Sequence, residues 1–420
     1  MDRLHGLIAD LGDHRKHSRR KHFTRNRALT LPVMVGIILT MVSDAGRSGY
    51  RHLVTTFWSA AKLVAIPLRQ KLPVNASAFC KARQRLPWQL FQTLFEDVAK
   101  KFVDRFGSEL LWKGRRLLAA DGLKLTLPHH ASLERAFGKP KGALRPMAAS
   151  VAVLDVLARV TLGVAFDRYA SGERPLLVSI LDRVPAGSVL LLDRGFPGFV
   201  LLSELVNRGI DFVARVPRCF GGVKRFVAAG QASGTINLVA PKSHPLKVPN
   251  RLSVRIERLE GGKEDLLLLT SLSHQVASRN EVRDLYRARW TIESEFKVLK
   301  ISGFGEDSFH SRTANGIKQE VCARLLFLNL SRCLLAEAAV RSGRQMTSLA
   351  PKSAQAMLAH TEALLVLIFR SPRTLRFVSF AFAILVRSRA ERRQGRHFPR
   401  VSRRPKRKWG PHGSTGRWND

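Results

Sequence analysis

Four polar residues with regular spacing stand out in the C-terminal half of the chain: Tyr286, Arg289, Glu293 and Lys300. On an α-helix, in which each residue turns by about 100°, they form one stripe beside an apolar seam. An arginine fork and a lysine ammonium can hold phosphate groups, and a carboxylate can bind a metal ion. A solvated helix face, with Arg289 and Glu293 as an ion pair one turn apart, explains the same pattern. The apolar seam consists of Leu285, Ile292, Phe296 and Leu299.

Two aspartates lie upstream in apolar surroundings. Asp121 stands inside the strand-like run Arg116–Pro128, where a buried charge without a partner is costly. Asp193 follows the continuous apolar run Val189–Leu192, at the carboxyl end of a strand that we expect to be covered on both faces. A turn or bulge at the first Asp-Gly pair is one structural alternative. A cap by Asp193 on a helix that starts near Gly198 is the other.

The spacing Tyr-x2-Arg-x3-Glu-x6-Lys resembles the signature of bacterial insertion-sequence transposases of the DDE class. Asp-Gly at 121–122 and Asp-Arg-Gly-Phe at 193–196 resemble the family's two other motifs, although Leu123 replaces a residue that is generally small and hydroxylated. The resemblance covers about residues 110–335. It implies an RNase H-like active site in which the catalytic, metal-binding carboxylates are Asp121, Asp193 and Glu293. It also implies that Tyr286, Arg289 and Lys300 grip the DNA end.

Three carboxylates and a polyanionic substrate point to metal-dependent chemistry at phosphorus. Oxygen ligands favour Mg²⁺ or Mn²⁺, and two such ions can activate an attacking oxygen and stabilise a leaving 3′ oxygen. By resemblance, Asp121 bridges the two ions, and Asp193 and Glu293 each complete one. We therefore expect a cut-and-paste DNA transposase that frees the ends of an insertion sequence by hydrolysis and joins their 3′ hydroxyls to target DNA. A nuclease of the same fold that cuts without joining and a DNA-binding derivative with a dead site are the alternatives.

The charge balance indicates the partner. The chain has 71 Lys and Arg against 32 Asp and Glu, a net charge of +39, and such an excess calls for a polyanion, most obviously nucleic acid. By resemblance, the DNA comprises terminal inverted repeats and target DNA, bound by a homodimer. The four cysteines include no Cys-x-x-Cys pair, so we expect neither a zinc site nor a disulfide framework. Without a signal peptide or an apolar run of membrane-spanning length, the expected location is the bacterial cytosol, at the nucleoid, with no membrane contact.

The order of three strands, helix, strand, helix, strand and a late helix predicts an α/β fold with an RNase H-like core, a mixed sheet flanked by helices. Short N-terminal helices with Lys81, Arg83 and Arg85 on one segment suit a DNA-reading module, although an ordinary bundle with solvated basic residues fits them too. The C-terminal helices suit either a closing layer of the core or a dimer surface. The expected divisions are a helical DNA-binding domain at 1–110, a catalytic domain at 111–335 with a β-rich insertion at about 217–275, C-terminal helices at 336–386, and a basic, disordered tail at 387–420.

Two further side-chain groups invite a functional reading. His129 and His130 follow the first strand, but paired loop histidines without a neighbouring carboxylate or cysteine are typically exposed and bind no metal. Trp290 adjoins the polar stripe and could stack on a base; we favour a packing role for it.

Overall fold

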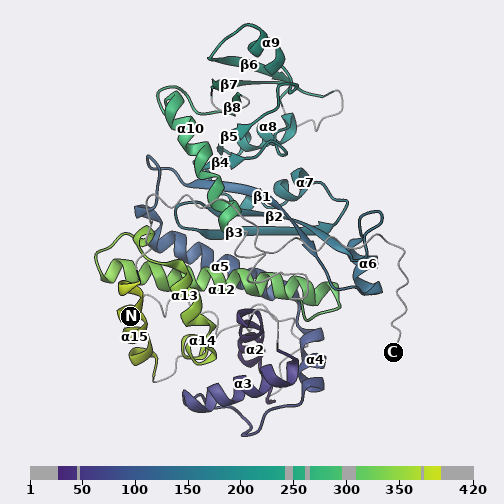
Figure 1. Ribbon diagram of the computed structural model, residues 1–420, viewed down its shortest axis with the longest axis vertical. Coiled ribbons are helices and arrows are strands. Elements are labelled where there is room, and N and C mark those ends of the chain that lie inside the picture. Colours follow the sequence, from purple (N-terminus) through teal and green to yellow (C-terminus); the bar gives the residue numbers. More distant parts are fainter. Residues whose placement is uncertain are drawn as a thin grey trace, which may run out of the picture.

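The computed structural model describes residues 27–44, 48–241, 249–260, 265–295, 309–369 and 373–388. Lys300, the basic stretch at residues 14–26 and nearly all of the basic tail lie outside these ranges. The framework is one eight-stranded mixed sheet with the strand order β3-β2-β1-β4-β5-β8-β7-β6 (Figure 1). Its strands are β1 (Leu117–Thr126), β2 (Met147–Asp155), β3 (Val160–Arg168), β4 (Val189–Leu192), β5 (Asp211–Arg215), β6 (Ser233–Val239), β7 (Arg251–Leu259) and β8 (Leu266–Thr270).

The first five strands confirm the predicted RNase H-like core. β1, β2 and β3 form an antiparallel meander, whereas β4 pairs parallel with both β1 and β5. The crossover after β3 contains helix α7 (Glu173–Val178), and the crossover after β4 contains α8 (Phe199–Asn207). All four residues of β4 are buried, as expected for a central strand covered on both faces.

The predicted β-rich insertion extends the core sheet. β8 pairs antiparallel with β5, and β7 and β6 follow as the outer strands. The strand-like sequence at residues 224–227 does not join them, because this stretch is part of the helix α9 (Val223–Ala228). Its buried residues, Val223 and Phe226, are three apart, a spacing that places both on one helix face.

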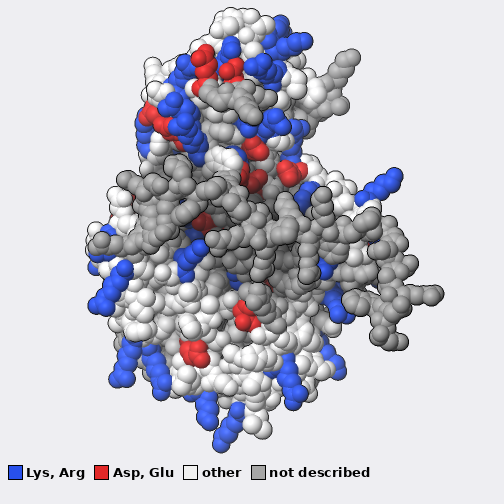
Figure 2. All heavy atoms as spheres, viewed as in Figure 1, with Lys and Arg blue, Asp and Glu red and all other residues white. Residues whose placement is uncertain are grey.

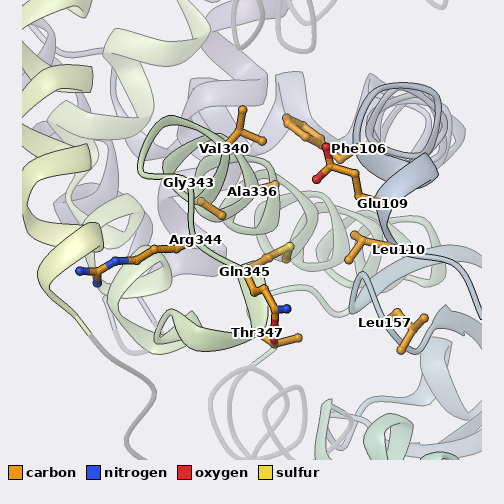
Figure 3. Close-up of a pocket in the computed structure, with 12 residues that line it drawn as sticks. Phe106, Glu109, Leu110, Leu157, Ala336, Val340, Gly343, Arg344, Gln345 and Thr347 are labelled. Carbon is orange, nitrogen blue, oxygen red and sulfur yellow. The ribbon is translucent and has the colours of Figure 1, made fainter.

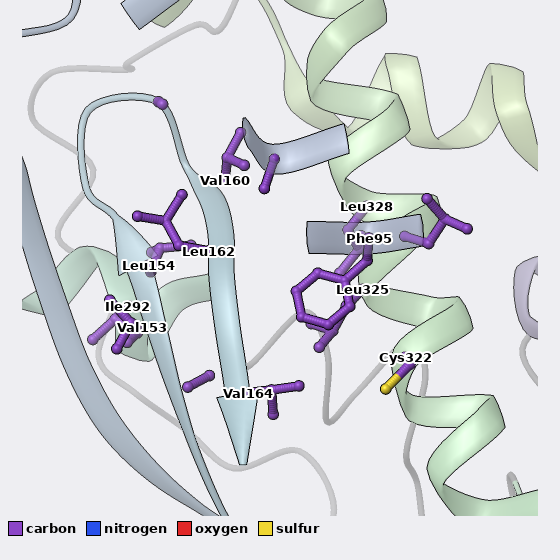
Figure 4. Close-up of a cluster of buried hydrophobic side chains, with 14 of the residues drawn as sticks. Phe95, Val153, Leu154, Val160, Leu162, Val164, Ile292, Cys322, Leu325 and Leu328 are labelled. Carbon is purple, nitrogen blue, oxygen red and sulfur yellow. The ribbon is translucent and has the colours of Figure 1, made fainter. Parts of the chain in front are cut away.

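Helices form two layers below the sheet in Figure 1. The long helices α5 (Trp88–Phe106) and α12 (Ala314–Arg341) run under β3, and α12 is buried along most of its length. Figure 4 shows Phe95 of α5 and Leu325 of α12 on the side of β3 to which Val164 points. The helix α12 therefore belongs to a closing layer of the core. The helices described here are α2 (Leu31–Ser43), α3 (Tyr50–Leu63), α4 (Ala76–Arg85), α5 (Trp88–Phe106), α6 (Ala131–Phe137), α12 (Ala314–Arg341), α13 (Pro351–Ala359), α14 (Thr361–Ile368) and α15 (Thr374–Arg387).

The N-terminal helices share one continuous apolar core with α12. Arg83 of α4 is only 5% exposed, and its Nη2 donates to Oε1 of Glu320 in α12 at 2.6 Å. The prediction that Arg83 belongs to a DNA-reading surface is wrong, because its guanidinium is buried and paired with Glu320. Lys81 and Arg85 of the same helix are exposed. Within the described part of the chain, no helix is both long and apolar enough to cross a membrane.

Candidate active site

Asp121 lies in a regular part of β1. It is paired with Ala152 of β2, and the ladder continues without a break on both sides. The alternative of a turn or bulge at this point is therefore wrong. The preceding residue, Ala120, is level with Leu192, the last residue of β4, so Asp121 stands where the neighbouring strand ends. The backbone N–H of Gly122 donates to Oδ1 of Asp121 at 2.9 Å.

Asp193 is the first residue after β4. The hydroxyl of Tyr286 donates to its Oδ1 at 3.3 Å. The helix α8 has Gly198 as its N-cap and no side-chain cap, so the alternative in which Asp193 caps this helix is wrong. Tyr286 is buried near the end of α10 (Arg279–Ala288), whose start is fixed by a capping box. The described partner of the Tyr286 hydroxyl is therefore the second aspartate.

The signature stretch is not one uninterrupted helix. α10 ends at Ala288, Arg289 is a turn residue, and residues 290–295 are helical again. At this turn the N–H of Arg289 donates to the carbonyl of Tyr286 at 3.1 Å, and the N–H of Ile292 donates to the carbonyl of Arg289 at 3.1 Å. These three-residue bonds tighten the backbone locally into a 3₁₀ geometry. Leu285 and Ile292 are buried as predicted, whereas Phe296, Leu299 and Lys300 lie outside the described residues.

Arg289 and Glu293 form a close ion pair, with 2.6 Å between Nη2 and Oε1. Arg289 is only 4% exposed, so the alternative of a solvated helix face is wrong. Its guanidinium carbon lies 5.6 Å from the ring centre of Tyr286 and 5.7 Å from that of Trp290. Burial alone would lower the pKa of Arg289, but the hydrogen bond to Glu293 and the nearby charge of Asp193 raise it above its ordinary value. The arginine is therefore the counter-cation of this acidic site.

The three predicted carboxylates act on one another. Burial raises the pKa of Asp121 from 3.8 to about 6, and the negative charges of Glu293 and Asp193 add to the rise. The hydrogen bond from Gly122 and the charge of Arg289 oppose it. The fold therefore brings all three to the same end of β1 and β4, within electrostatic reach of one another. A site that disfavours its own negative charge is suited to a cation, and the oxygen-only donor set suits a hard divalent one.

The arrangement described here is not a closed set of metal ligands. Among the described residues, no three His, Cys, Asp or Glu side chains are grouped so that they could hold a metal ion as they stand. Glu293 uses Oε1 for Arg289. The roles of Asp121, Asp193 and Glu293 as metal ligands, and of Tyr286 and Arg289 as DNA contacts, stay predictions.

The two secondary readings of the sequence have different outcomes. Nδ1 of His130 accepts a hydrogen bond from the backbone N–H of Ser132 at 3.2 Å and caps helix α6, so this histidine has a structural role. Trp290 is 60% exposed, so the packing role that we favoured is wrong. Its indole lies beside Arg289 at the surface of the site.

Sequence reasoning missed two glutamates near the site. A Cβ at Gly122 would overlap the carboxylate of Glu173, with Oε2 only 2.9 Å away. Because side-chain directions alternate along a strand, Glu173 faces the side of β1 opposite to Asp121. A glycine inside a strand pattern was the available signal, since it often marks such a close approach.

Glu295 is the second missed residue. It lies two positions after Glu293, and its Oε2 accepts from Nη2 of the buried Arg332 in α12 at 2.7 Å. Arg159, on the β2–β3 hairpin, is 3.6 Å from its other carboxylate oxygen. These two contacts tie residues 290–295 to the helical layer and to the β2–β3 hairpin. No local sequence pattern predicts them.

A cavity of about 560 Å³ lies away from these residues, between the end of α5, the η2 turn (Gly107–Glu109) and the end of α12. Figure 3 shows its lining, which includes Phe106, Leu110 and Val340 and none of the predicted site residues. Glu109 is the one carboxylate among the described residues of this lining, so the cavity does not compete with the three-carboxylate site as a centre for a divalent metal.

Comparison with known proteins decides the family. The family model described as "Transposase DDE domain" matches residues 112–330. The chain belongs to this family. It is 24% identical over 320 residues to "Transposase InsG for insertion sequence element IS4" of Escherichia coli strain K12, a match that covers 73% of this chain and 70% of that protein. This transposase is therefore an enzyme of the DDE class that acts on DNA, and its family uses a divalent metal.

One solved structure that is similar to this chain is also of a transposase. The cryo-EM structure of a piggyBac transposase synaptic complex with hairpin DNA covers 92% of this chain and 83% of its own, with a TM-score of 0.45 and 10% identity.

Proposed function

We propose that the transposase cuts the ends of an insertion sequence with two Mg²⁺ or Mn²⁺ ions held by Asp121, Asp193 and Glu293, and then joins the freed 3′ hydroxyls to target DNA. The observation that supports this most directly is the raised pKa of Asp121, to which burial and the charges of the two other carboxylates contribute. When bound, the ions would activate the attacking oxygen and stabilise the leaving 3′ oxygen. One carboxylate site would serve both hydrolysis and strand transfer.

The residues around the carboxylates have separate tasks in this proposal. Tyr286 orients Asp193 through its hydroxyl, which restricts the directions in which the second carboxylate can present its free oxygen. Arg289 provides a planar fork for a phosphate next to the scissile bond. Lys300 adds a point charge for the same DNA end, by family resemblance. The exposed indole of Trp290 stands at the surface where DNA would approach.

DNA binding rests on the wider charge distribution. Figure 2 shows Lys and Arg spread over this face, both over the upper strands and over the helices at the lower end. We propose that the helices within residues 1–110 recognise the terminal inverted repeats, with Lys81 and Arg85 among the exposed basic residues. A homodimer would bring the two ends of the element together. The basic tail would add non-specific affinity through phosphate contacts.

A cleavage and joining assay tests the proposal. The full-length protein, a duplex with the element's own end and Mg²⁺ should give a nick at the element boundary and, with target plasmid, a joined product. Asp121→Asn, Asp193→Asn and Glu293→Gln should each reduce cleavage by about 1,000-fold or more, because stabilisation of the reacting charges by a metal ion is worth several kcal/mol. End binding should persist in all three.

Asp284→Asn is the matched control, since this carboxylate lies on α10, the helical piece before the one that carries Glu293, and is 61% exposed. Its cleavage rate should stay within a few-fold of the unmodified protein. Near-normal cleavage by any of the three site variants would remove that residue from the assignment. Cleavage without any joined product would favour the nuclease alternative.

A further inference from the structure

Arg289 is held in an unusual position for a residue that grips DNA. Its Nη2 donates to Oε1 of Glu293 at 2.6 Å, an oxygen that the proposed function assigns to a metal ion. The side chain is almost fully buried, and its Nε and Nη1 have no hydrogen-bond partner among the described residues. A buried guanidinium with two unused donors retains most of its capacity for a phosphate.

The contact lies at a tight turn in the described part of the signature stretch. The backbone changes to three-residue hydrogen bonds on both sides of Arg289. Beyond it, Glu295 is anchored to Arg332 of the core at 2.7 Å. The segment that carries Glu293 is therefore fixed to the helical layer, while the arginine stands at the join between two helical pieces. Separation of Arg289 from Glu293 needs a change of the arginine side chain and no movement of the carboxylate.

We propose that Arg289 alternates between two partners: it closes on Glu293 in the free protein and turns to a DNA phosphate when a divalent cation takes Glu293. This inference rests on the proposed function, in which Glu293 is a metal ligand. Its consequence is that metal and DNA strengthen each other's binding, because each one opens the same closed contact. By linkage, the factor by which Mn²⁺ tightens DNA binding must equal the factor by which DNA tightens Mn²⁺ binding.

The strength of the contact sets the size of the effect. The Arg289–Glu293 hydrogen bond joins two charged groups and is shielded from solvent on the arginine side. Bonds of this type correspond to an equilibrium factor of about 10- to 100-fold. The mutual enhancement between Mn²⁺ and DNA should reach this range, and the same factor should weaken Mn²⁺ binding to the DNA-free protein.

The test measures binding, with no turnover. Mn²⁺ affinity is measured by electron paramagnetic resonance for the full-length protein alone and in complex with a pre-cleaved duplex of the element's end. The affinity of this duplex is measured with and without Mn²⁺. Arg289→Met should raise the Mn²⁺ affinity of the DNA-free protein by about 10-fold or more, and the enhancement by DNA should fall by a similar factor. A thermal unfolding curve verifies that the variant is folded.

Arg287→Met is the matched control: Arg287 lies on α10, its side chain is 68% exposed, and its partner is Asp284. It should change neither quantity by more than about 3-fold, because exposed pairs are weak and screened. An Arg289→Met protein whose Mn²⁺ affinity is unchanged or lower overturns the proposal, as does full enhancement in that variant. Glu293→Gln distinguishes a failure of the proposed switch from a failure of the proposed metal site. If it lowers Mn²⁺ affinity while Arg289→Met has no effect, only the switch fails; if it has no effect, the metal assignment of Glu293 fails.

Discussion

Replacement of Asp121 by Asn should stabilise the metal-free transposase at neutral and basic pH. Burial and two neighbouring carboxylates raise the pKa of Asp121 from 3.8 to about 6, so the ionised form is disfavoured in the folded state. At about 1.4 kcal/mol for each pKa unit, this rise corresponds to at most about 3 kcal/mol. Asp121 is partly accessible to solvent, and screening should reduce the effect to about 1–2 kcal/mol. The amide oxygen of Asn can still accept the hydrogen bond from Gly122.

The pH dependence identifies the cause. The folded state binds the proton of Asp121 more tightly than the unfolded chain does, so the cost of ionisation is fully present above about pH 6 and disappears as the pH falls toward 3.8. Asp121→Asn cannot ionise, so its advantage should be largest at pH 8 and about half as large at pH 5. Added Mg²⁺ should reduce the advantage at pH 8, because an ion bound only to the folded form stabilises the unmodified site more.

Urea denaturation of both proteins at pH 8, 6 and 5, with and without Mg²⁺, measures these differences. Asp284→Asn, which removes an exposed carboxylate on α10, is the control for net charge and should show no comparable gain. The reasoning that the site disfavours the negative charge of Asp121 would be refuted by an Asp121→Asn protein that is no more stable than the unmodified protein at pH 8. A gain in the free energy of unfolding that is the same at every pH would refute it too.

Three other substitutions test the framework around the site. Arg332→Met should lower the free energy of unfolding by about 3–5 kcal/mol, because it leaves the carboxylate of Glu295 largely buried without its main partner; the double change with Glu295→Met should recover part of the loss, and urea denaturation measures both. Arg83→Met should cost a similar amount by the same mechanism, yet filter binding at a temperature where the variant is folded should give unchanged affinity for the element's end. Gly122→Ala should change the free energy of unfolding by less than about 1 kcal/mol, because its Cβ would overlap only the carboxylate end of Glu173, a flexible side chain that can turn aside; with Glu173→Ala in addition, no loss should remain, and the thermal unfolding midpoint measures both.

The sequence by itself determined the elements of the core and their order. Val189–Leu192 is a strand because four consecutive apolar side chains need cover on both faces. Helix α8 begins after Gly198, where the sequence places a helix start, because its apolar positions follow the helical period from there to a polar end. The two aspartates could be placed on the first and fourth strands for the same reason. These features depend on the pattern of a few neighbouring residues, which the chain carries locally.

Only the tertiary structure decided which charged side chains form pairs. A local pattern shows that a residue is charged, but its partner can come from any distant segment. Arg83 reads like Lys81 and Arg85 in the sequence, yet only Arg83 meets a buried glutamate of α12. The signature stretch reads as one helix, yet its backbone tightens at Arg289. That arginine is the counter-cation of a carboxylate site because β1, β4 and α10 converge there, and this convergence is a property of the fold and of no single segment.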